Sequence, residues 1–177
     1  MKKVLLSLVS LVVLAFVFAF TLPQNWAIAD KYNITFTTSG VSGIFKNFTG
    51  NIIFDEQNVA ASKFDVSIDV ASINTGNGMQ NKHAKSSEWF DAAKYPTIRF
   101  VSKKLVKSGN SYFVTGDLQM HGITKEQTIP FNFKKSGSEA KFEGTFNVNR
   151  NEYGIGKAGG EVGDVIKLIV SVPVVKK

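Results

Sequence analysis

The feature of this sequence that most constrains its fold is a strict alternation of apolar and polar residues. In the clearest segment, Phe64, Val66, Ile68 and Val70 alternate with charged or hydroxyl side chains. A period of two places one side of a β-strand against a core and the other side in solvent. The pattern recurs in eight segments, which cover residues 26–36, 48–54, 64–70, 98–102, 114–120, 129–133, 142–148 and 166–174. The chain is therefore predicted to be all-β.

Short polar turns separate several of these segments. Residues 107–110 read Lys-Ser-Gly-Asn, and residues 135–138 read Lys-Ser-Gly-Ser. Glycine beside small polar residues is typical of turns. Links this short join antiparallel strands. Eight such strands in succession predict an up-and-down barrel or a sandwich.

One polar segment, residues 73–96, interrupts the alternation. Met79, His83 and Phe90 fall on one side of a short helix in this segment. We expect it to be a crossover with one or two short helices that cap an end of the barrel. Trp89, Phe90 and Tyr95 are then expected to pack against the strands.

The N-terminus has the pattern of a secretory signal. Two lysines precede an apolar run at residues 4–20, which matches the n-region and h-region of such signals. We assign residues 1–20 to a signal peptide and 21–177 to one barrel domain, with cleavage between residues 19 and 29. An uncleaved anchor is the alternative, because the run is only slightly shorter than a membrane span. The protein is expected in the periplasm or outside the cell.

Composition narrows the function classes further. The chain has no cysteine, so the core alone must stabilise the domain. The net charge is +7, but the lysines are scattered and Arg99 and Arg150 are the only arginines. A nucleic-acid interface favours a basic stripe that contains arginines, so no nucleic-acid partner is expected. The 15 phenylalanines are unusual, and most of them must be housed in the fold.

No pattern of catalytic or metal-binding residues stands out. The sequence lacks a G-x-S-x-G nucleophile motif and a phosphate-binding loop. His83 and His121 are the only histidines, and even with Asp91 they form a weak zinc set, since zinc sites take three or four such ligands. Each histidine is better explained by a hydrogen bond to backbone or to a neighbour. We therefore predict a protein that is not an enzyme and has no metal and no cofactor.

Three glycines share the parity of the large apolar residues, namely Gly50, Gly116 and Gly144. Glycine within a strand marks a bend or a close approach of backbones. Small residues among phenylalanines would also leave internal space, and a barrel of eight strands is wide enough to hold one small ligand. These residues alone do not decide between a filled barrel and one with a cavity.

From Trp26 to the C-terminus the chain resembles the YceI-like family of secreted bacterial proteins. The most specific stretch is Gly116–Lys125, and Asn81–Asp91, Tyr95–Phe100 and Asn149–Gly154 support it. The resemblance implies an eight-stranded antiparallel lipocalin-like barrel with a short helical crossover. It also implies a polyisoprenoid ligand.

The chain departs from the family's common pattern at a few polar positions. Lys31, Gly40 and Gln80 stand where family members often carry other polar or charged residues, and Asn149 replaces a frequent aspartate. The resemblance places these positions near the polar end of the ligand. They affect the preferred head group and leave the barrel unchanged.

With this ligand, the apolar interior becomes the expected binding site. The predicted ligand-binding residues are Phe36, Phe48, Phe54, Phe64, Phe100, Phe131, Phe133, Phe142, Phe146 and Arg150. Arg150 ends an inward-facing row, where its planar guanidinium suits a phosphate or carbonyl head group. The alternative for Arg150 is an ion pair with Asp91, Glu152 or Asp164. The expected partners are a long isoprenoid or another lipid and, transiently, a membrane.

Two other functions give the same sequence pattern. A structural or interaction barrel would have a filled core and no ligand. A lipid-modifying enzyme would use His83 or His121. The oligomeric state and the identity of the ligand stay open.

Overall fold

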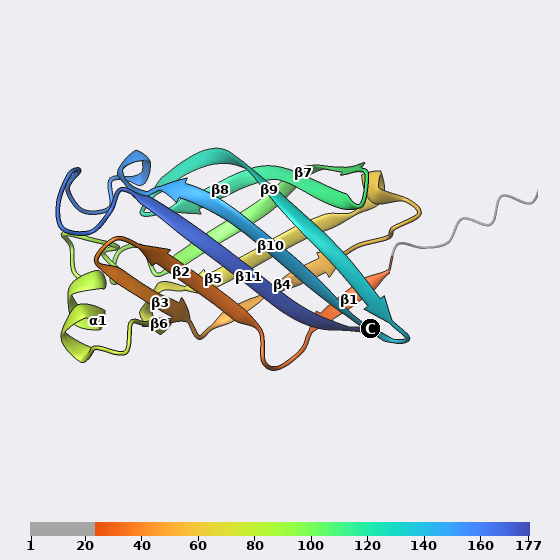
Figure 1. Ribbon diagram of the computed structural model, residues 1–177, viewed down its shortest axis with the longest axis horizontal. Helices are drawn as coiled ribbons and strands as arrows, with labels where there is room; N and C mark the ends of the chain where they lie inside the picture. Colours follow the sequence, from red (N-terminus) through yellow and green to blue (C-terminus); the bar gives the residue numbers. More distant parts are fainter. Residues whose placement is uncertain (1–23) are drawn as a thin grey trace, which may run out of the picture.

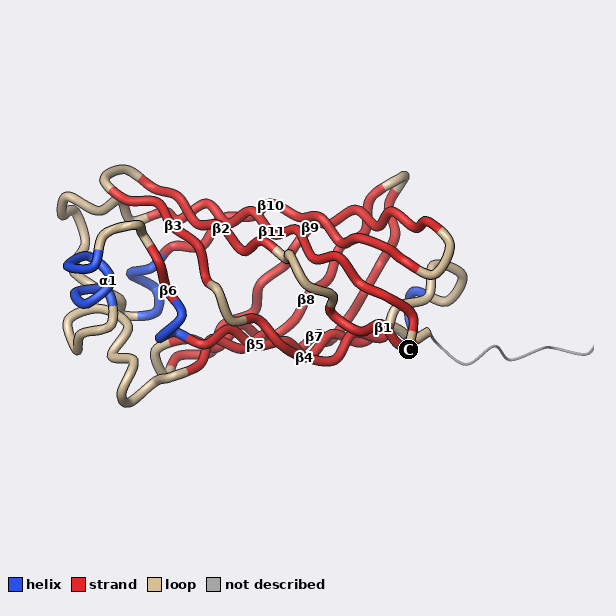
Figure 2. Tube along the Cα trace, turned by 90° about the horizontal axis from the view of Figure 1, so that it is seen from below, coloured by secondary structure: helices blue, strands red, loops and turns tan. Residues whose placement is uncertain are grey.

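The computed structural model describes residues 24–177, which form a barrel with its helical segment at one end (Figures 1 and 2). The predicted signal peptide, residues 1–20, lies outside the described residues. The strands are β1 (Asn25–Ile28), β2 (Asn33–Thr38), β3 (Val41–Phe45), β4 (Phe48–Ile53), β5 (Lys63–Asp69), β6 (Ile73–Asn74), β7 (Thr97–Ser108), β8 (Ser111–Met120), β9 (Ile123–Ser136), β10 (Glu139–Asn149) and β11 (Val165–Lys176). The helices are α1 (Gly78–Ala84) and the 3₁₀ turns η1 (Val59–Ala61), η2 (Val70–Ser72) and η3 (Arg150–Tyr153).

These strands close into an antiparallel barrel of eight. Three of the eight barrel strands are interrupted, and each consists of two successive elements that follow one another along the wall. These are β1 with β2, β3 with β4, and β5 with β6. The ring closes because β11 pairs with both β1 and β2, while β1 also pairs with β4. The predicted eight-stranded antiparallel barrel is therefore confirmed, and the sandwich is excluded.

The structure adds two strands that the alternation did not predict, β3 and the two-residue β6. In β3 the inward positions include Gly43, whose small size hides the pattern. A Cβ atom at Gly43 would lie 2.6 Å from the ring of Phe36, so the glycine makes room for that phenylalanine. The segment predicted over residues 26–36 is also divided, because Lys31 adopts a positive φ of 67° between β1 and β2.

The predicted turns are present where the sequence placed them. Gly109 and Gly137 lie in the short links β7–β8 and β9–β10, each with a positive φ. A third tight link, His121–Gly122 between β8 and β9, has positive φ values of 50° and 75°. Two consecutive positive values are the requirement of a type I′ hairpin turn.

The crossover has a short helix, as predicted, at the end of the barrel (Figure 2). The Asn77 side chain caps it by accepting hydrogen bonds from the backbone N–H groups of Met79 and Gln80. Phe90 packs edge-to-face on Phe45, with ring centroids 6.3 Å apart. The prediction that Met79, His83 and Phe90 share one side of a helix was wrong, because α1 ends at Ala84 and Phe90 lies beyond it. The Met79 side chain is 82% exposed.

The three inward-parity glycines are explained mainly by close backbone contacts. A Cβ atom at Gly116 would collide with the carbonyl of Val101, beside an irregularity in the β7–β8 register between Ser102 and Lys104. At Gly50 the same atom would collide with the carbonyl of Asp65. These glycines therefore allow the strands to bend and to cross closely. Among the described residues, no helix is long and apolar enough to span a membrane.

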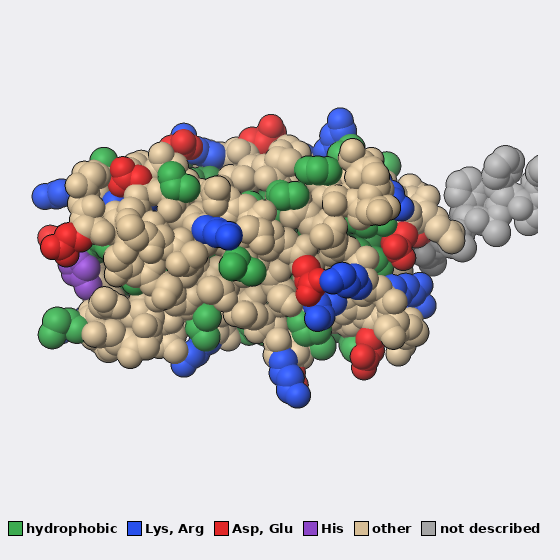
Figure 3. All heavy atoms as spheres, viewed as in Figure 1, with side chains coloured by type: hydrophobic (Ala, Val, Ile, Leu, Met, Phe, Trp, Pro, Cys, Tyr) green, Lys and Arg blue, Asp and Glu red, His purple; other side chains and the backbone are tan. Residues whose placement is uncertain are grey.

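Surface charge follows the scattered lysines of the sequence. On the face shown in Figure 3, cationic and anionic side chains are interspersed and neither sign covers a broad area. Ion pairs on the surface of the described residues include Lys103 with Asp117 and Lys134 with Glu143. This face does not show the single-sign stripe that is typical of a nucleic-acid interface.

Candidate functional site

The barrel encloses a cavity of about 1070 Å³. Its wall is formed by inward side chains of the strands, and it reaches the α1 end, where Gln80, His83, Lys157 and Glu161 border it. The interior is therefore not filled by the protein's own side chains. The aromatic side chains that line it are Phe36, Phe45, Phe48, Phe64, Trp89, Phe90, Phe100, Phe131, Phe142 and Phe146.

An aromatic cluster closes the opposite end of the barrel. At its centre Phe54 is 1% exposed. Its ring centroid lies 4.7–6.2 Å from those of five other aromatic residues, namely Phe64, Tyr112, Phe131, Phe133 and Phe142. Trp26 covers the cluster, because its ring packs on Phe133 at 5.4 Å and its indole N–H donates to the Phe54 carbonyl at 3.0 Å. The cavity thus has an aromatic closed end and a polar open end.

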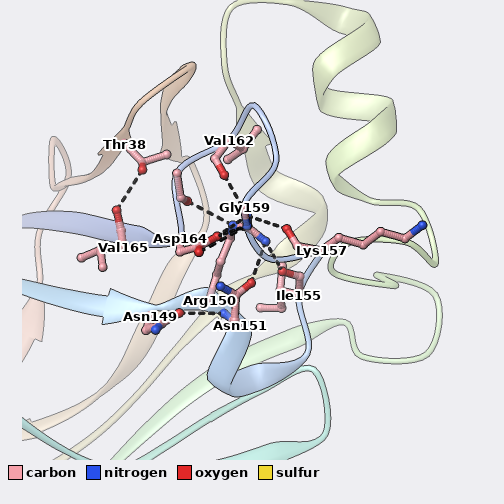
Figure 4. A network of polar contacts seen from close by, with 11 residues as sticks. Thr38, Asn149, Arg150, Asn151, Ile155, Lys157, Gly159, Val162, Asp164 and Val165 are labelled. Atoms are coloured by element: carbon pink, nitrogen blue, oxygen red, sulfur yellow. Dashed lines mark hydrogen bonds and ion pairs between the residues drawn. The ribbon is translucent and has the colours of Figure 1, made fainter.

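Arg150 organises the loop that borders the open end (Figure 4). Its side chain is nearly fully buried. Nε donates to the Gly163 carbonyl, and Nη1 donates to Asn151 Oδ1 and the Ile155 carbonyl. Nη2 donates to the carbonyls of Lys157 and Val162, and to Asp164 Oδ1 at 2.8 Å.

Every N–H of the guanidinium is therefore engaged within the chain, since arginine carries five such donors. Of the two roles considered for Arg150, the structure contains the ion pair, and its partner is Asp164. The guanidinium also lies over the Trp89 ring, 5.1 Å from its centroid. Arg150 thus holds residues 150–164 and Trp89 in place beside the cavity.

We expect Asp164 to make the stability of the fold depend on pH in the acidic range. The Asn151 side chain, the backbone N–H of Gly159 and the Arg150 guanidinium hold the pKa of Asp164 below its ordinary value. A carboxylate with a lowered folded-state pKa stabilises the fold above its unfolded pKa, about 3.9 for aspartate, and that stability is lost as the pH falls through the folded value. Urea denaturation measured from neutral pH down to pH ~3 should show this loss below about pH 4.

The matched variant is Asp164→Asn. It should be less stable than the wild type at neutral pH and lose less stability in acid. Asp65, whose pKa is lowered by Arg99, titrates in both proteins, so the difference between their curves isolates Asp164. Parallel curves would contradict the assignment.

Both histidines hydrogen-bond to neighbouring groups. His83 Nε2 accepts from the Trp89 indole N–H at 2.7 Å. His121 Nδ1 lies 2.9 Å from the carbonyl oxygen of Tyr153, and its ring packs on Tyr95. In the part of the chain that the structure describes, no three His, Cys, Asp or Glu side chains are grouped so that they could hold a metal ion.

Comparison with known proteins identifies the family. The model of the YceI-like domain matches residues 26–174. The chain belongs to the YceI-like family. It is 33% identical to protein YceI of Escherichia coli over 140 residues, which cover 76% of this chain and 73% of that protein. It is 36% identical to a UPF0312 protein of Pseudomonas putida over 146 residues, which cover 78% and 76%.

Solved structures of other proteins share the barrel. The structure of BcnA from Burkholderia cenocepacia matches with a TM-score of 0.76 and 29% identity, over 81% of this chain and 96% of that one. A polyisoprenoid binding domain from Saccharophagus degradans matches with a TM-score of 0.62 over 86% and 94%. At 12% identity the latter shows only the common fold.

Eight of the residues predicted from the sequence line the cavity, and two do not. The eight are Phe36, Phe48, Phe64, Phe100, Phe131, Phe142, Phe146 and Arg150. Phe54 and Phe133 lie instead in the aromatic cluster of the closed end. Whether any of the eight contacts a ligand stays a prediction.

Sequence reasoning missed several residues of this YceI-like cavity. Phe45 belongs to β3, which was not predicted. Trp89 and Phe90 were expected only to pack on strands, yet both line the cavity. Aliphatic wall residues such as Leu168 were not among the predicted ligand-binding residues. The alternation could have identified them, because they occupy inward positions of the strands.

The departures from the family pattern lie at the cavity, at a helix cap and in a link between strands. Gln80 and Gly40 line the open end of the cavity. Asn149 caps η3, where its side chain accepts a hydrogen bond from the Asn151 backbone N–H. Lys31 lies in the link between β1 and β2 and does not line the cavity. Of these positions, only Gln80 brings a polar side chain to the cavity.

Proposed function

We propose that this protein binds one long isoprenoid, or a similar apolar lipid, inside the barrel. The observation that carries the proposal is the apolar cavity of about 1070 Å³, which is closed by aromatic rings at one end and open at the other. Such a volume is at the upper end of the range of small-molecule sites, about 300–1,000 Å³. The polyisoprenoid binding domain from Saccharophagus degradans has the same fold, which supports a ligand of this class.

The volume sets the size of the ligand. At ~30 Å³ per heavy atom, the share of a water molecule in the liquid, the cavity holds roughly 35 heavy atoms. At ~0.3 kcal/mol per atom, these atoms would contribute about 10 kcal/mol of binding free energy. A dissociation constant below the micromolar range is expected on that basis.

The cavity also favours one orientation of the ligand. Its apolar chain would extend towards the rings of Phe64, Phe131 and Phe142, where a polar head would lose its hydrogen bonds to water. The head group would lie at the open end, near Gln80 and His83. Because the Arg150 donors are engaged within the loop, other groups at this end would contact the head group.

We infer binding without chemical conversion. Neither histidine lies in a group that could hold a metal ion within the described residues. His83 is engaged by the Trp89 indole and His121 by the Tyr153 backbone. Transient contact with a membrane belongs to this proposal, because a bilayer is where such a lipid would be exchanged.

We also propose that the protein is exported. The apolar run after two lysines supports a signal peptide. Cleavage after Ala29 would remove β1, which carries the buried Trp26 and pairs with both β4 and β11. Cleavage near Ala19 leaves the barrel whole. The intact mass of the protein recovered from the periplasm or the medium should correspond to a chain that begins between residues 20 and 25; a full-length mass would favour the anchor.

Binding is tested with a prenyl alcohol of about 35 carbons, which matches the capacity of the cavity. Leu168 lines the cavity in β11, and Leu168→Trp adds an indole to the apolar space. Because the larger side chain displaces about five ligand atoms, affinity should fall about tenfold. Titration of delipidated protein with a fluorescent analogue measures this change.

Val165→Trp provides the control, because Val165 lies on the same strand but is 54% exposed. Its affinity for the alcohol should match that of the wild type. If the wild type takes up no alcohol, or if both variants lose affinity equally, the cavity is not the binding site.

A further inference from the structure

The wall of the barrel is interrupted between β9 and β10. Their ladder runs from the pair Glu139–Ser136 to the pair Gly144–Phe131 and ends there. Beyond this point, residues 123–130 of β9 pair only with β8, and residues 145–149 of β10 pair only with β11. Half of β9 and nearly half of β10 therefore have no ladder with each other.

Two residues explain why the ladder ends here. The next position along β9 is Pro130, which has no backbone N–H to donate to a neighbouring strand. Gly144, which pairs with the neighbouring Phe131, is the last paired residue of β10, and a Cβ atom at Gly144 would be 2.8 Å from the Pro130 carbonyl oxygen. The two backbones approach closely at this point and pair no further.

A groove on the outside of the barrel begins at the same place. This side groove has a volume of about 410 Å³ and includes Pro130, Thr145 and Ile169 on its walls. Phe131, Glu143, Gly144 and Val170 line both the side groove and the main cavity. The two spaces therefore lie on either side of the same wall residues, next to the end of the ladder.

The side groove offers apolar surface next to the polar side chains of Ser111, Asn132, Thr145 and Ser171. Phe131 and Val170 present apolar surface, and Ile169 on the outer wall is 40% exposed. The Glu143 carboxylate is held by Lys134 at 2.8 Å and Lys141 at 3.5 Å. Its charge is thus compensated at the surface.

We propose that the side groove is a second opening of the cavity, through which the apolar tail of a long isoprenoid leaves the barrel. This inference rests on the proposed function. At ~30 Å³ per heavy atom the groove adds roughly 14 atoms to the roughly 35 of the main cavity. A barrel with this opening keeps the tail of a longer chain in contact with the groove, whereas with a fully paired wall the excess chain could leave only through the α1 end, without those contacts.

The test compares two prenyl alcohols, one of about 25 carbons and one of about 45, which fall below and above the capacity of the main cavity. Thr145→Trp fills the side groove from its outer wall. The variant should bind the longer alcohol about tenfold more weakly than the wild type does, the equivalent of roughly five tail atoms losing their contacts. Its affinity for the shorter alcohol should be unchanged.

Two further variants make the result specific. Thr49→Trp places the same bulk on β4, at a position whose pairing with Ser67 of β5 is intact, and should bind both alcohols as the wild type does. Ile169→Trp fills the groove from β11 and should weaken binding of the longer alcohol to the same extent as Thr145→Trp. It provides the test if Thr145→Trp does not fold. Equal affinities of groove-filled and wild-type protein for the longer alcohol would overturn the second opening alone. A wild type that binds neither alcohol would overturn the proposed function as well.

Discussion

Arg150→Met is expected to lower the free energy of unfolding by about 3 kcal/mol, the lower end of the range for breaking a buried ion pair. The lower end applies because Asp164, at 36% side-chain exposure, keeps part of its contact with water. Methionine fills much of the same space but donates no hydrogen bond. The carbonyls of Ile155, Lys157, Val162 and Gly163 would then lose their common donor.

The other arginine of the chain provides a matched control. Arg99 makes a bidentate pair with Asp65, but the two side chains are 50% and 44% exposed. Exposed pairs contribute about 0–1 kcal/mol, so Arg99→Met should have a small effect. Urea denaturation of both variants measures the difference. Equal losses of stability would contradict the structural role of Arg150.

Arg150→Lys separates charge from geometry. Lysine keeps the positive charge opposite Asp164 but lacks the planar fork that reaches several acceptors at once. We expect it to recover only a minor part of the lost stability. Affinity for the shorter prenyl alcohol, measured on the same variants while they are folded, addresses the ligand role. Lowered stability with unchanged affinity would exclude a head-group contact by Arg150.

The roles of Arg150 illustrate what the sequence could predict. Its inward parity correctly placed it beside the cavity, because a period of two determines the side of a strand. Its partners are mostly backbone carbonyls of a loop, and a carbonyl has no residue-specific signature in a sequence. The ion pair with Asp164 was among three alternatives, and only the folded loop selects one of them.

The phenylalanines show a second limit of the same kind. Alternation predicted that Phe54 and Phe64 both point inward, and both do. It gives no information on depth along the barrel axis, which is determined by strand stagger and tilt. Phe64 therefore lines the cavity while Phe54 belongs to the closed end. The ladder break at Pro130 was likewise not predicted, since it depends on which residue of β10 lies opposite.

Phe54→Ala is expected to lower the free energy of unfolding by about 3–5 kcal/mol, as for other fully buried phenylalanines. Five aromatic neighbours would lose the ring on which they pack. Phe113 provides the control, because it lies on β8 between the buried Tyr112 and Val114 and faces outward. Phe113→Ala should lose clearly less stability in the same urea titration. If both substitutions have similar effects, the aromatic cluster does not anchor the closed end.

The same substitution tests whether the closed end limits the ligand. Phe64, Phe131 and Phe142 contact Phe54 on one side and line the cavity on the other. Loss of the ring would therefore extend the apolar space towards Trp26. In protein kept folded at low denaturant, affinity for the longer alcohol should be at least that of the wild type, even though stability falls. A loss of affinity for both alcohols would instead mean that the aromatic cluster keeps the cavity in its binding shape, because its collapse would reduce the volume available to any chain.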